Sequence, residues 1–352
     1  MVKIERQDLV PPFAFGYFIP FFRLGDGTHP EHPGPMKYPL GKNISAGVFE
    51  DGMVVFDFAR CEETPIVIHR ESLWNGDGAE EDVAKRLQRT EHKQKLNQKF
   101  YRSVLLAHIL LLENAGRMVG GVSFEIPSRI EKISDAFGCY GIPSSPPPRP
   151  TGKPVSEPSA PRLGTKAFER SFSDLNRALA DGSGALLKAL EYHKLSQYRA
   201  LDHRFAESLV LSWMVCENMI HSIWKQMIDE VKSSDSGRMT GKRAEIPGKS
   251  SASTASGRIR ILERVGRLSA EQATSLNEIR RARNDWLHSF KDVEEQIAFG
   301  SIGNCARLIS SVCDIAMDRW SVAGAGGGGG GMFLNSFRER FPDVDLEGAY
   351  DG

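Results

Sequence analysis

Arg283, Asn284 and His288 lie close together in the sequence and combine side chains that bind phosphate and transfer protons. Arginine holds phosphate oxygens through a planar fork of N–H donors. Histidine is the one side chain that ordinarily gains and loses a proton near neutral pH. Residues of these types at this spacing therefore favour a site that holds a phosphate group and moves a proton beside it.

The three residues fall in a helix that we expect from Ser269 to Phe290, starting at a capping box formed by Ser269 and Gln272. With about 100° between successive residues, the apolar side chains share one inward face. These side chains are Leu276, Ile279, Trp286, Leu287 and Phe290. Arg283 falls near the middle of that face, where an arginine needs a compensating partner.

A polar stripe follows one edge of the same face. Arg280, Asn284 and His288 are spaced four residues apart along it, an arrangement typical of a cleft lining. In the alternative interpretation, Arg283 only anchors a structural ion pair and His288 is an ordinary surface histidine.

An earlier helix, predicted from Asp202 to Val231, offers a partner for Arg283. Its inward stripe consists of Val210, Trp213, Glu217, Ile220, Trp224 and Ile228. Glu217 is the one charged member, so we expect a bidentate ion pair with Arg283 that directs the remaining arginine donors toward a phosphate. A purely structural buried salt bridge is the alternative.

Any attraction for nucleic acid has to be local, because 45 basic residues balance 45 acidic ones. Between Ala255 and Lys291, eight basic residues stand against four acidic ones. Arg280, Arg281 and Lys291 are the candidates among them for contacts with an RNA backbone. A solvated helix face is the alternative.

The 352 residues are enough for two domains. We expect an α+β N-terminal domain of unknown role at 1–142, a proline-rich linker at 143–163, an all-α helical bundle at 164–322 and a glycine-rich tether and tail at 323–352. The linker contains eight prolines, which exclude a helix or a central strand there.

Periodicity also predicts the individual elements. In the N-terminal domain we expect a β-hairpin from strands at 47–49 and 53–59, further strands at 64–69 and 119–124, and a helix at 80–116. In the bundle we expect helices at 166–179, 185–198, 202–231, 259–268, 269–290 and 293–322.

The five cysteines form no CxxC pair and suit a reducing compartment. The N-terminus does not read as a signal peptide, and the longest largely apolar run, Val104 to Leu112, is too short to span a bilayer. We therefore expect a soluble, cytoplasmic protein without membrane contact. The sequence has no metal-ligand pattern and no nucleotide-binding glycine motif, so we expect neither a metal nor another cofactor.

The helical half resembles the HEPN domain family. Arg283-Asn284 followed by three residues and His288 fits the family's Arg-x4-6-His motif, and Glu217 matches an acidic residue on a preceding long helix. The resemblance covers roughly Lys166 to Val322. It implies a metal-independent endoribonuclease, commonly a toxin or an abortive-infection protein of antiviral defence, whose two motif helices face each other across a homodimer.

The resemblance also implies roles for the motif residues. His288 would act as general acid or base while the 2′-hydroxyl of RNA attacks its own phosphodiester. Arg283 would hold the phosphate and stabilise its charge, and Asn284 would orient the imidazole or contact the phosphate. Arg283 and His288 diverge by about 140° on an ideal helix, so we expect a second copy to complete the site.

Some members of the family carry a tyrosine, two residues after the histidine, that a partner enzyme nucleotidylates. Phe290 stands at that position and cannot be modified in this way. The N-terminal domain is a candidate for binding an antitoxin or a phage or cellular trigger. Two alternatives stay open, a catalytically silent HEPN-like module that binds a nucleotide or a protein, and a plain helical scaffold.

Overall fold

The computed structural model of the protein describes residues 13–16, 18–19, 23–24, 36–49, 54–58, 61, 99–118, 129–130, 162–234 and 254–317. Its contacts divide the chain into two compact units, Met1–Leu195 and Ser196–Gly352. The division falls inside helix α4 (Ala185–Leu201) and not in the proline-rich segment. Helix α3 (Thr165–Ala180) and most of α4, which the sequence assigns to the C-terminal bundle, therefore belong to the first unit.

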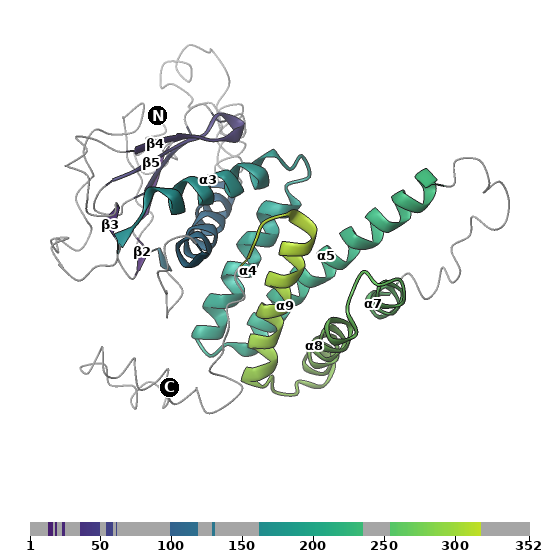
Figure 1. Ribbon diagram of the computed structural model, residues 1–352. Helices are drawn as coiled ribbons and strands as arrows, with labels where there is room; N and C mark the ends of the chain where they lie inside the picture. The colour runs from purple at the N-terminus through teal and green to yellow at the C-terminus, as the bar shows by residue number, and fades with distance from the viewer. Residues whose placement is uncertain are drawn as a thin grey trace, which may run out of the picture. The chain divides into compact units, whose positions relative to one another are not determined.

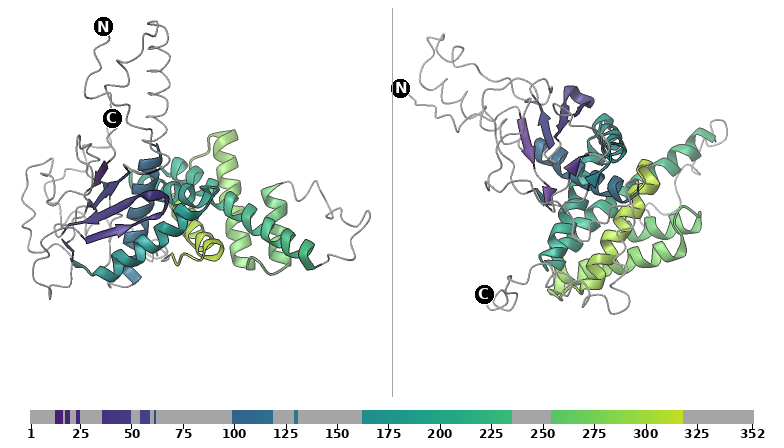
Figure 2. Two further views of the ribbon diagram at one scale, coloured as in Figure 1. Left: turned by 90° about the horizontal axis from the view of Figure 1, so that it is seen from above. Right: turned by 60° about the vertical axis from the view of Figure 1, so that its left-hand side comes forward.

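The first unit contains an antiparallel sheet with strand order β1-β6-β5-β4 (Figure 2). The strands are β1 (Phe13–Gly16), β4 (Met36–Pro39), β5 (Ser45–Val48) and β6 (Val54–Asp57). The pairing of β5 with β6 confirms the predicted hairpin. Strand β4 was not predicted, and its proline is tolerated because β4 is at the edge of the sheet.

Two small two-stranded sheets complete the strands of this unit. Strand β2 (Phe18–Ile19) pairs antiparallel with β7 (Arg129–Ile130), and β3 (Arg23–Leu24) pairs parallel with β8 (Arg162–Leu163). Residues 99–118 form a helix whose middle is buried. Its observed part agrees with the predicted helix at 80–116.

Aromatic rings join the sheet to the helices of the first unit. Tyr38 of β4 and Phe56 of β6 lie opposite the same residue of β5, so they project from one face. Tyr38 stacks on Phe172 of α3 with 4.4 Å between ring centroids, and Phe56 meets that ring edge-on at 6.3 Å. His108 stacks on the same ring at 4.5 Å. These contacts hold α3 in the first unit.

The described helices of the second unit, besides the end of α4, are α5 (Phe205–Ser234), α7 (Ala255–Arg264), α8 (Ala270–Ser289) and α9 (Glu295–Cys313). Helix α9 packs along α5, while α7 and α8 form an adjacent pair that contacts α5 (Figure 1). The buried residues of α9 include the small side chains of Ala298, Ser301, Cys305 and Ala306 beside the larger Ile302, Leu308 and Ile309. The thiol of Cys305 donates to the carbonyl oxygen of Ser212 in α5 at 3.5 Å.

The helices agree with the predicted ones apart from their ends. Helix α7 begins at Ala255, four residues before its predicted start. Helix α9 ends at Cys313, followed by Asp314 in a left-handed conformation, and does not reach Val322. The predicted strands at 64–69 and 119–124, nearly all of the linker and the tail at 323–352 lie outside the described residues.

At the coarser level, the described residues confirm an α+β part followed by a largely helical part. Of the helices that the structure describes, none is both long and apolar enough to cross a membrane.

Candidate functional site

Helix α8 is fixed at its start by the predicted capping box. The hydroxyl of Ser269 accepts a hydrogen bond from the backbone N–H of Gln272 at 3.1 Å, and the Gln272 side chain accepts one from the N–H of Ser269 at 3.0 Å. Ala273, Leu276 and Ile279 then bury one face of the helix. This anchored first half of α8 positions the motif residues that follow.

Arg283 is half-buried and is oriented by its neighbour in the chain. Its Nη1 donates to Oδ1 of Asn284, which is also half-buried, at 2.9 Å. The Nε atoms of Arg283 and of the half-buried Arg280 are buried and make no hydrogen bond to any described residue. Buried donors are normally satisfied, and a bidentate oxyanion is the kind of ligand that would satisfy these two.

The predicted ion pair between Arg283 and Glu217 is not formed. Glu217 is exposed, and the described residues include no salt bridge between the two side chains. Trp213, Ile220 and Trp224 of the predicted stripe are buried, but the buried face of α5 is centred to one side of that stripe and also includes Cys216, Met219 and Ile223. Glu217 therefore lies outside the edge of the buried face.

The end of α8 is also more exposed than predicted. The buried residues of the helix stop at Ile279; Trp286 is half-buried, Leu287 is 40% exposed and Phe290 is 83% exposed. Side-chain contacts from α9, Asn304 to Ser275 and Arg307 to Glu271, reach the first half of α8. The apolar face predicted from the sequence therefore extends along α8 beyond the part that these α9 side chains contact.

The remaining motif residues lie on this exposed end. The side chain of His288 is exposed and makes no hydrogen bond with the described part of the chain. Arg281 and Lys291, predicted to contact RNA, are exposed as well. The structure thus joins Arg283 to Asn284 by a direct contact, and records none between Arg283 and His288 within one chain.

Part of the basic surface next to α8 already has partners. Nη1 of Arg258 in α7 lies 3.3 Å from Nδ1 of His221 in α5, and Arg267 forms an ion pair with Glu230. Arg260 is exposed on α7. Of the basic residues counted in the sequence, Arg267 therefore has a carboxylate partner, and basic side chains lie exposed on α7 as well as at the end of α8.

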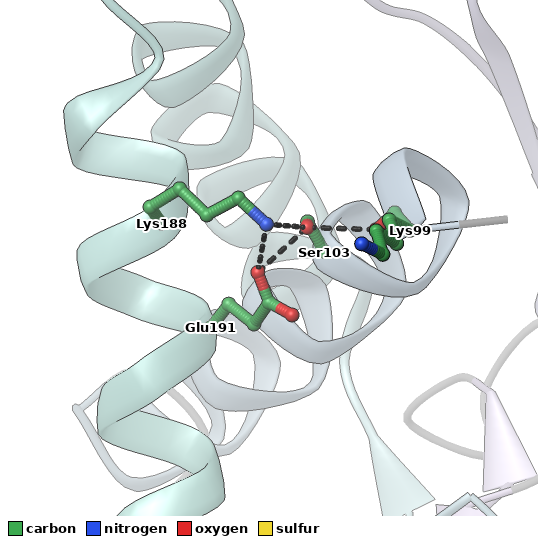
Figure 3. A network of polar contacts seen from close by, with 4 residues as sticks. All are labelled: Lys99, Ser103, Lys188 and Glu191. Atoms are coloured by element: carbon green, nitrogen blue, oxygen red, sulfur yellow. Dashed lines mark hydrogen bonds and ion pairs between the residues drawn. The ribbon is translucent and has the colours of Figure 1, made fainter. Parts of the chain in front are cut away.

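A polar network in the first unit was not predicted from the sequence (Figure 3). Nζ of Lys188 lies 2.6 Å from Oε2 of Glu191 and donates to Oγ of Ser103 at 2.9 Å. Oγ of Ser103 lies 2.7 Å from the same carboxylate oxygen and 2.8 Å from the carbonyl oxygen of Lys99. The network joins α4 to the helix of residues 99–118.

A serine beside a lysine can act as a nucleophile with the lysine as its general base. Ser103 and Lys188 are arranged differently. Ser103 is 1% exposed, which leaves no room for a substrate at its hydroxyl. A lysine base has to be neutral, whereas Lys188 is ion-paired with Glu191. We therefore interpret the network as a structural link between two helices.

A second buried pair lies further along the same two helices. Nζ of Lys194 is 2.7 Å from Oε2 of Glu113, and the two side chains are 0% and 5% exposed. Burial, together with the smaller effect of the charge of Lys194, lowers the pKa of the neighbouring His193 to about 3. Burial also lowers the pKa of His108 to about 3. Both histidines are therefore neutral at physiological pH.

The described residues contain no group of three or more histidine, cysteine, aspartate or glutamate side chains that could hold a metal ion. The strongest arrangement for function is therefore the end of α8, with Arg280, Arg283, Asn284 and His288.

Comparison of the chain with known proteins found no family model, no curated protein and no solved structure that matches it.

Proposed function

We propose that the protein is a metal-independent endoribonuclease of the HEPN type that acts as a toxin or an antiviral defence effector. The observation that supports this most is the hydrogen bond from Arg283 to Asn284 on the half-buried edge of α8. Beside it, Arg280 and Arg283 have buried Nε donors that no described residue satisfies. His288 is exposed one turn beyond Asn284.

These residues suit cleavage of RNA by its own 2′-hydroxyl. Arg283 would hold the phosphodiester and stabilise the charge that develops on its oxygens. His288 would exchange a proton with the attacking 2′-oxygen or the departing 5′-oxygen. The bond from phosphorus to the 5′-oxygen breaks as the bond to the 2′-oxygen forms, which leaves a 2′,3′-cyclic phosphate and a 5′-hydroxyl. Glu217 has no bracing role in this scheme because it is exposed.

A composite site in a homodimer fits the arrangement of α8. His288 and Arg283 project in directions about 140° apart on an ideal helix, so a second copy would bring its own histidine to the phosphate held by Arg283. We expect this dimer to act in the cytoplasm. The N-terminal part of the chain would receive an antitoxin or a phage or cellular trigger.

The decisive experiment is digestion of total RNA in the presence of EDTA. Wild-type protein should cleave and His288→Ala should not, while the matched control His221→Ala, at another exposed histidine of the second unit, should cleave like wild type. End analysis should find cyclic phosphates and 5′-hydroxyls. Fragments with 3′-hydroxyl ends that appear only with magnesium would contradict the proposal.

One observation favours a second candidate, a catalytically silent module that binds RNA or a nucleotide. The imidazole of His288 makes no hydrogen bond to the described residues, whereas a general acid or base is usually oriented by a partner. In that case wild-type protein and His288→Ala would bind RNA equally and neither would cleave it.

A further inference from the structure

Arg280 and Arg283 lie next to each other on one side of α8. They are three residues apart, which separates their directions by about 60° on an ideal helix and places their Cβ atoms about 5–6 Å apart. Both side chains are half-buried, and the Nε of each is buried without a hydrogen bond to any described residue. The two guanidinium groups therefore share one part of the helix surface.

The charges of these two arginines have no carboxylate partner among the described residues. Other half-buried arginines form ion pairs with carboxylates, namely Arg170 with Asp174, Arg199 with Glu207 and Arg307 with Glu271. Even Arg170, whose Nε also lacks a hydrogen bond, has its charge balanced in this way. Arg280 and Arg283 thus bring two positive charges together without a described counter-charge.

The acidic residues nearest in the chain do not supply that counter-charge. Glu278 and Asp285 are exposed and project about 140–160° from both arginines on an ideal helix. Asp292, Glu294 and Glu295 are exposed beyond the end of α8 and form no ion pair with either arginine. An anionic ligand is the group that would balance the two charges.

Arg283 keeps one edge of its guanidinium for such a ligand. Its Nη1 is used in the hydrogen bond to Asn284. A guanidinium has a second fork, formed by Nε and Nη2, that can bind two oxygens of one oxyanion. Arg280 has the same kind of fork, with its own unsatisfied Nε. Two forks with two charges suit a phosphoryl group that carries two negative charges.

The proposed reaction passes through a group of this kind. An RNA phosphodiester carries one negative charge. When the 2′-hydroxyl gives its proton to a base and its oxygen bonds to phosphorus, a second negative charge spreads over the phosphoryl oxygens. The charge returns to one when the bond to the 5′-oxygen breaks and that oxygen takes up a proton. Groups that bind this doubly charged state more tightly than the substrate accelerate the reaction.

We propose that Arg280 and Arg283 together form one site for a doubly charged phosphoryl group, and that Arg280 is therefore a second catalytic arginine. The proposal deepens the proposed function and rests on it for the identity of the substrate. One arginine would balance the charge of the phosphodiester, while the pair balances the transition state. Arg280 should then act mainly on kcat and little on KM.

Two small anions test the charge preference without RNA. At about pH 8, methyl phosphate carries two negative charges and dimethyl phosphate carries one. Wild-type protein should bind methyl phosphate about tenfold more tightly at constant ionic strength, measured by the rise of Tm with anion concentration. Arg280→Gln should bind both anions equally. Arg260→Gln, at an exposed arginine of α7, is the matched control and should keep the wild-type preference.

Cleavage of RNA tests the catalytic role. Arg280→Gln should lower kcat at least about tenfold and change KM less than about threefold, whereas Arg260→Gln should change neither. The Tm of Arg280→Gln should not fall, because the replaced charge has no described carboxylate partner. Arg280→Lys keeps the charge and the aliphatic stem but loses the fork. It should therefore fold like wild type and show a smaller loss of kcat.

Equal affinity of wild-type protein for the two phosphates would overturn the proposal. So would a preference that survives in Arg280→Gln, or a rise in KM at unchanged kcat, which would mean that Arg280 only attracts RNA. If the preference depends on Arg280 but wild-type protein cleaves no RNA, the nuclease is contradicted, and the two arginines are supported as a site for a terminal phosphate group.

Discussion

Nη1 of Arg283 donates a hydrogen bond of 2.9 Å to Oδ1 of Asn284, the next residue of α8. The partner is neutral, so the guanidinium keeps its charge available for an anion. A carboxylate at the same place would compete with phosphate for the same donors. The arginine is therefore oriented by an amide instead of the buried carboxylate that the sequence predicts.

Replacing Asn284 tests this orientation. Asn284→Asp should reduce the rate of RNA cleavage roughly tenfold or more, because the new carboxylate forms a charge-assisted bond with Arg283. Asn284→Ala should have a smaller effect, since it removes one hydrogen bond and adds no competitor. Cleavage rates measured with urea unfolding of both variants check the prediction. An aspartate variant as active as wild type would show that Arg283 does not hold the phosphate.

Glu217→Gln tests whether Glu217 is exposed, as in the structure, or pairs with a buried cation. We expect a change in the free energy of unfolding of no more than about 0.5 kcal/mol, as for other exposed substitutions, and an unchanged cleavage rate. Chemical unfolding and RNA digestion measure the two quantities. A loss of about 3 kcal/mol or more, typical of a broken buried pair, would mean that Glu217 pairs with a buried cation after all.

Lys194→Met should destabilise the first unit strongly. It leaves Glu113 buried without its 2.7 Å partner, and breaking a buried ion pair costs about 3–5 kcal/mol. The double variant Lys194→Met and Glu113→Leu should recover most of the loss because it removes both charges. Urea unfolding of the single and double variants gives the comparison. If the single and the double variant had the same free energy of unfolding, the charges of Lys194 and Glu113 would not be coupled.

The first unit should lose stability in acid through His108. Its pKa is lowered from 6.5 to about 3 by burial. Above pH 6.5 both folded and unfolded chains carry it neutral, but between pH 6.5 and about 3 only the unfolded chain binds the proton. The free energy of unfolding should therefore fall by up to about 1.4 kcal/mol per pH unit for this residue.

His108→Gln removes that contribution. In urea unfolding between pH 7.5 and 4.5, the variant should show a shallower pH slope than wild type, whatever its stability at neutral pH. His193 has a similarly lowered pKa and should keep part of the slope. An unchanged slope would mean that protonation of His108 does not oppose folding.

Local signals in the sequence were sufficient for several elements. The hydroxyl and amide of Ser269 and Gln272 predict the start of α8 because a capping box involves only adjacent residues. The two predicted strands at 47–49 and 53–59 are separated by only three residues, which predicts the pairing of β5 with β6 for a similar reason. Both features depend on residues a few positions apart.

Features that depend on neighbouring elements were predicted less well. Helical periodicity identifies a shared face, but it does not show where the covering helices end, so Leu287 and Phe290 were expected to be buried and are exposed. Glu217 was expected to be buried because that prediction used the periodicity of α5 alone and not the helices that pack against it. Lys194 and Glu113 meet across 81 positions of sequence, a distance over which no local pattern operates.

The small buried side chains of α9 have a consequence for sequence change. Ala298, Ser301, Cys305 and Ala306 are buried, and protein interiors are closely packed. Side-chain size should therefore limit the substitutions that evolution tolerates at these positions more than polarity does. Exchanges among alanine, serine and cysteine should accumulate, while leucine or phenylalanine should be purged even though both are apolar.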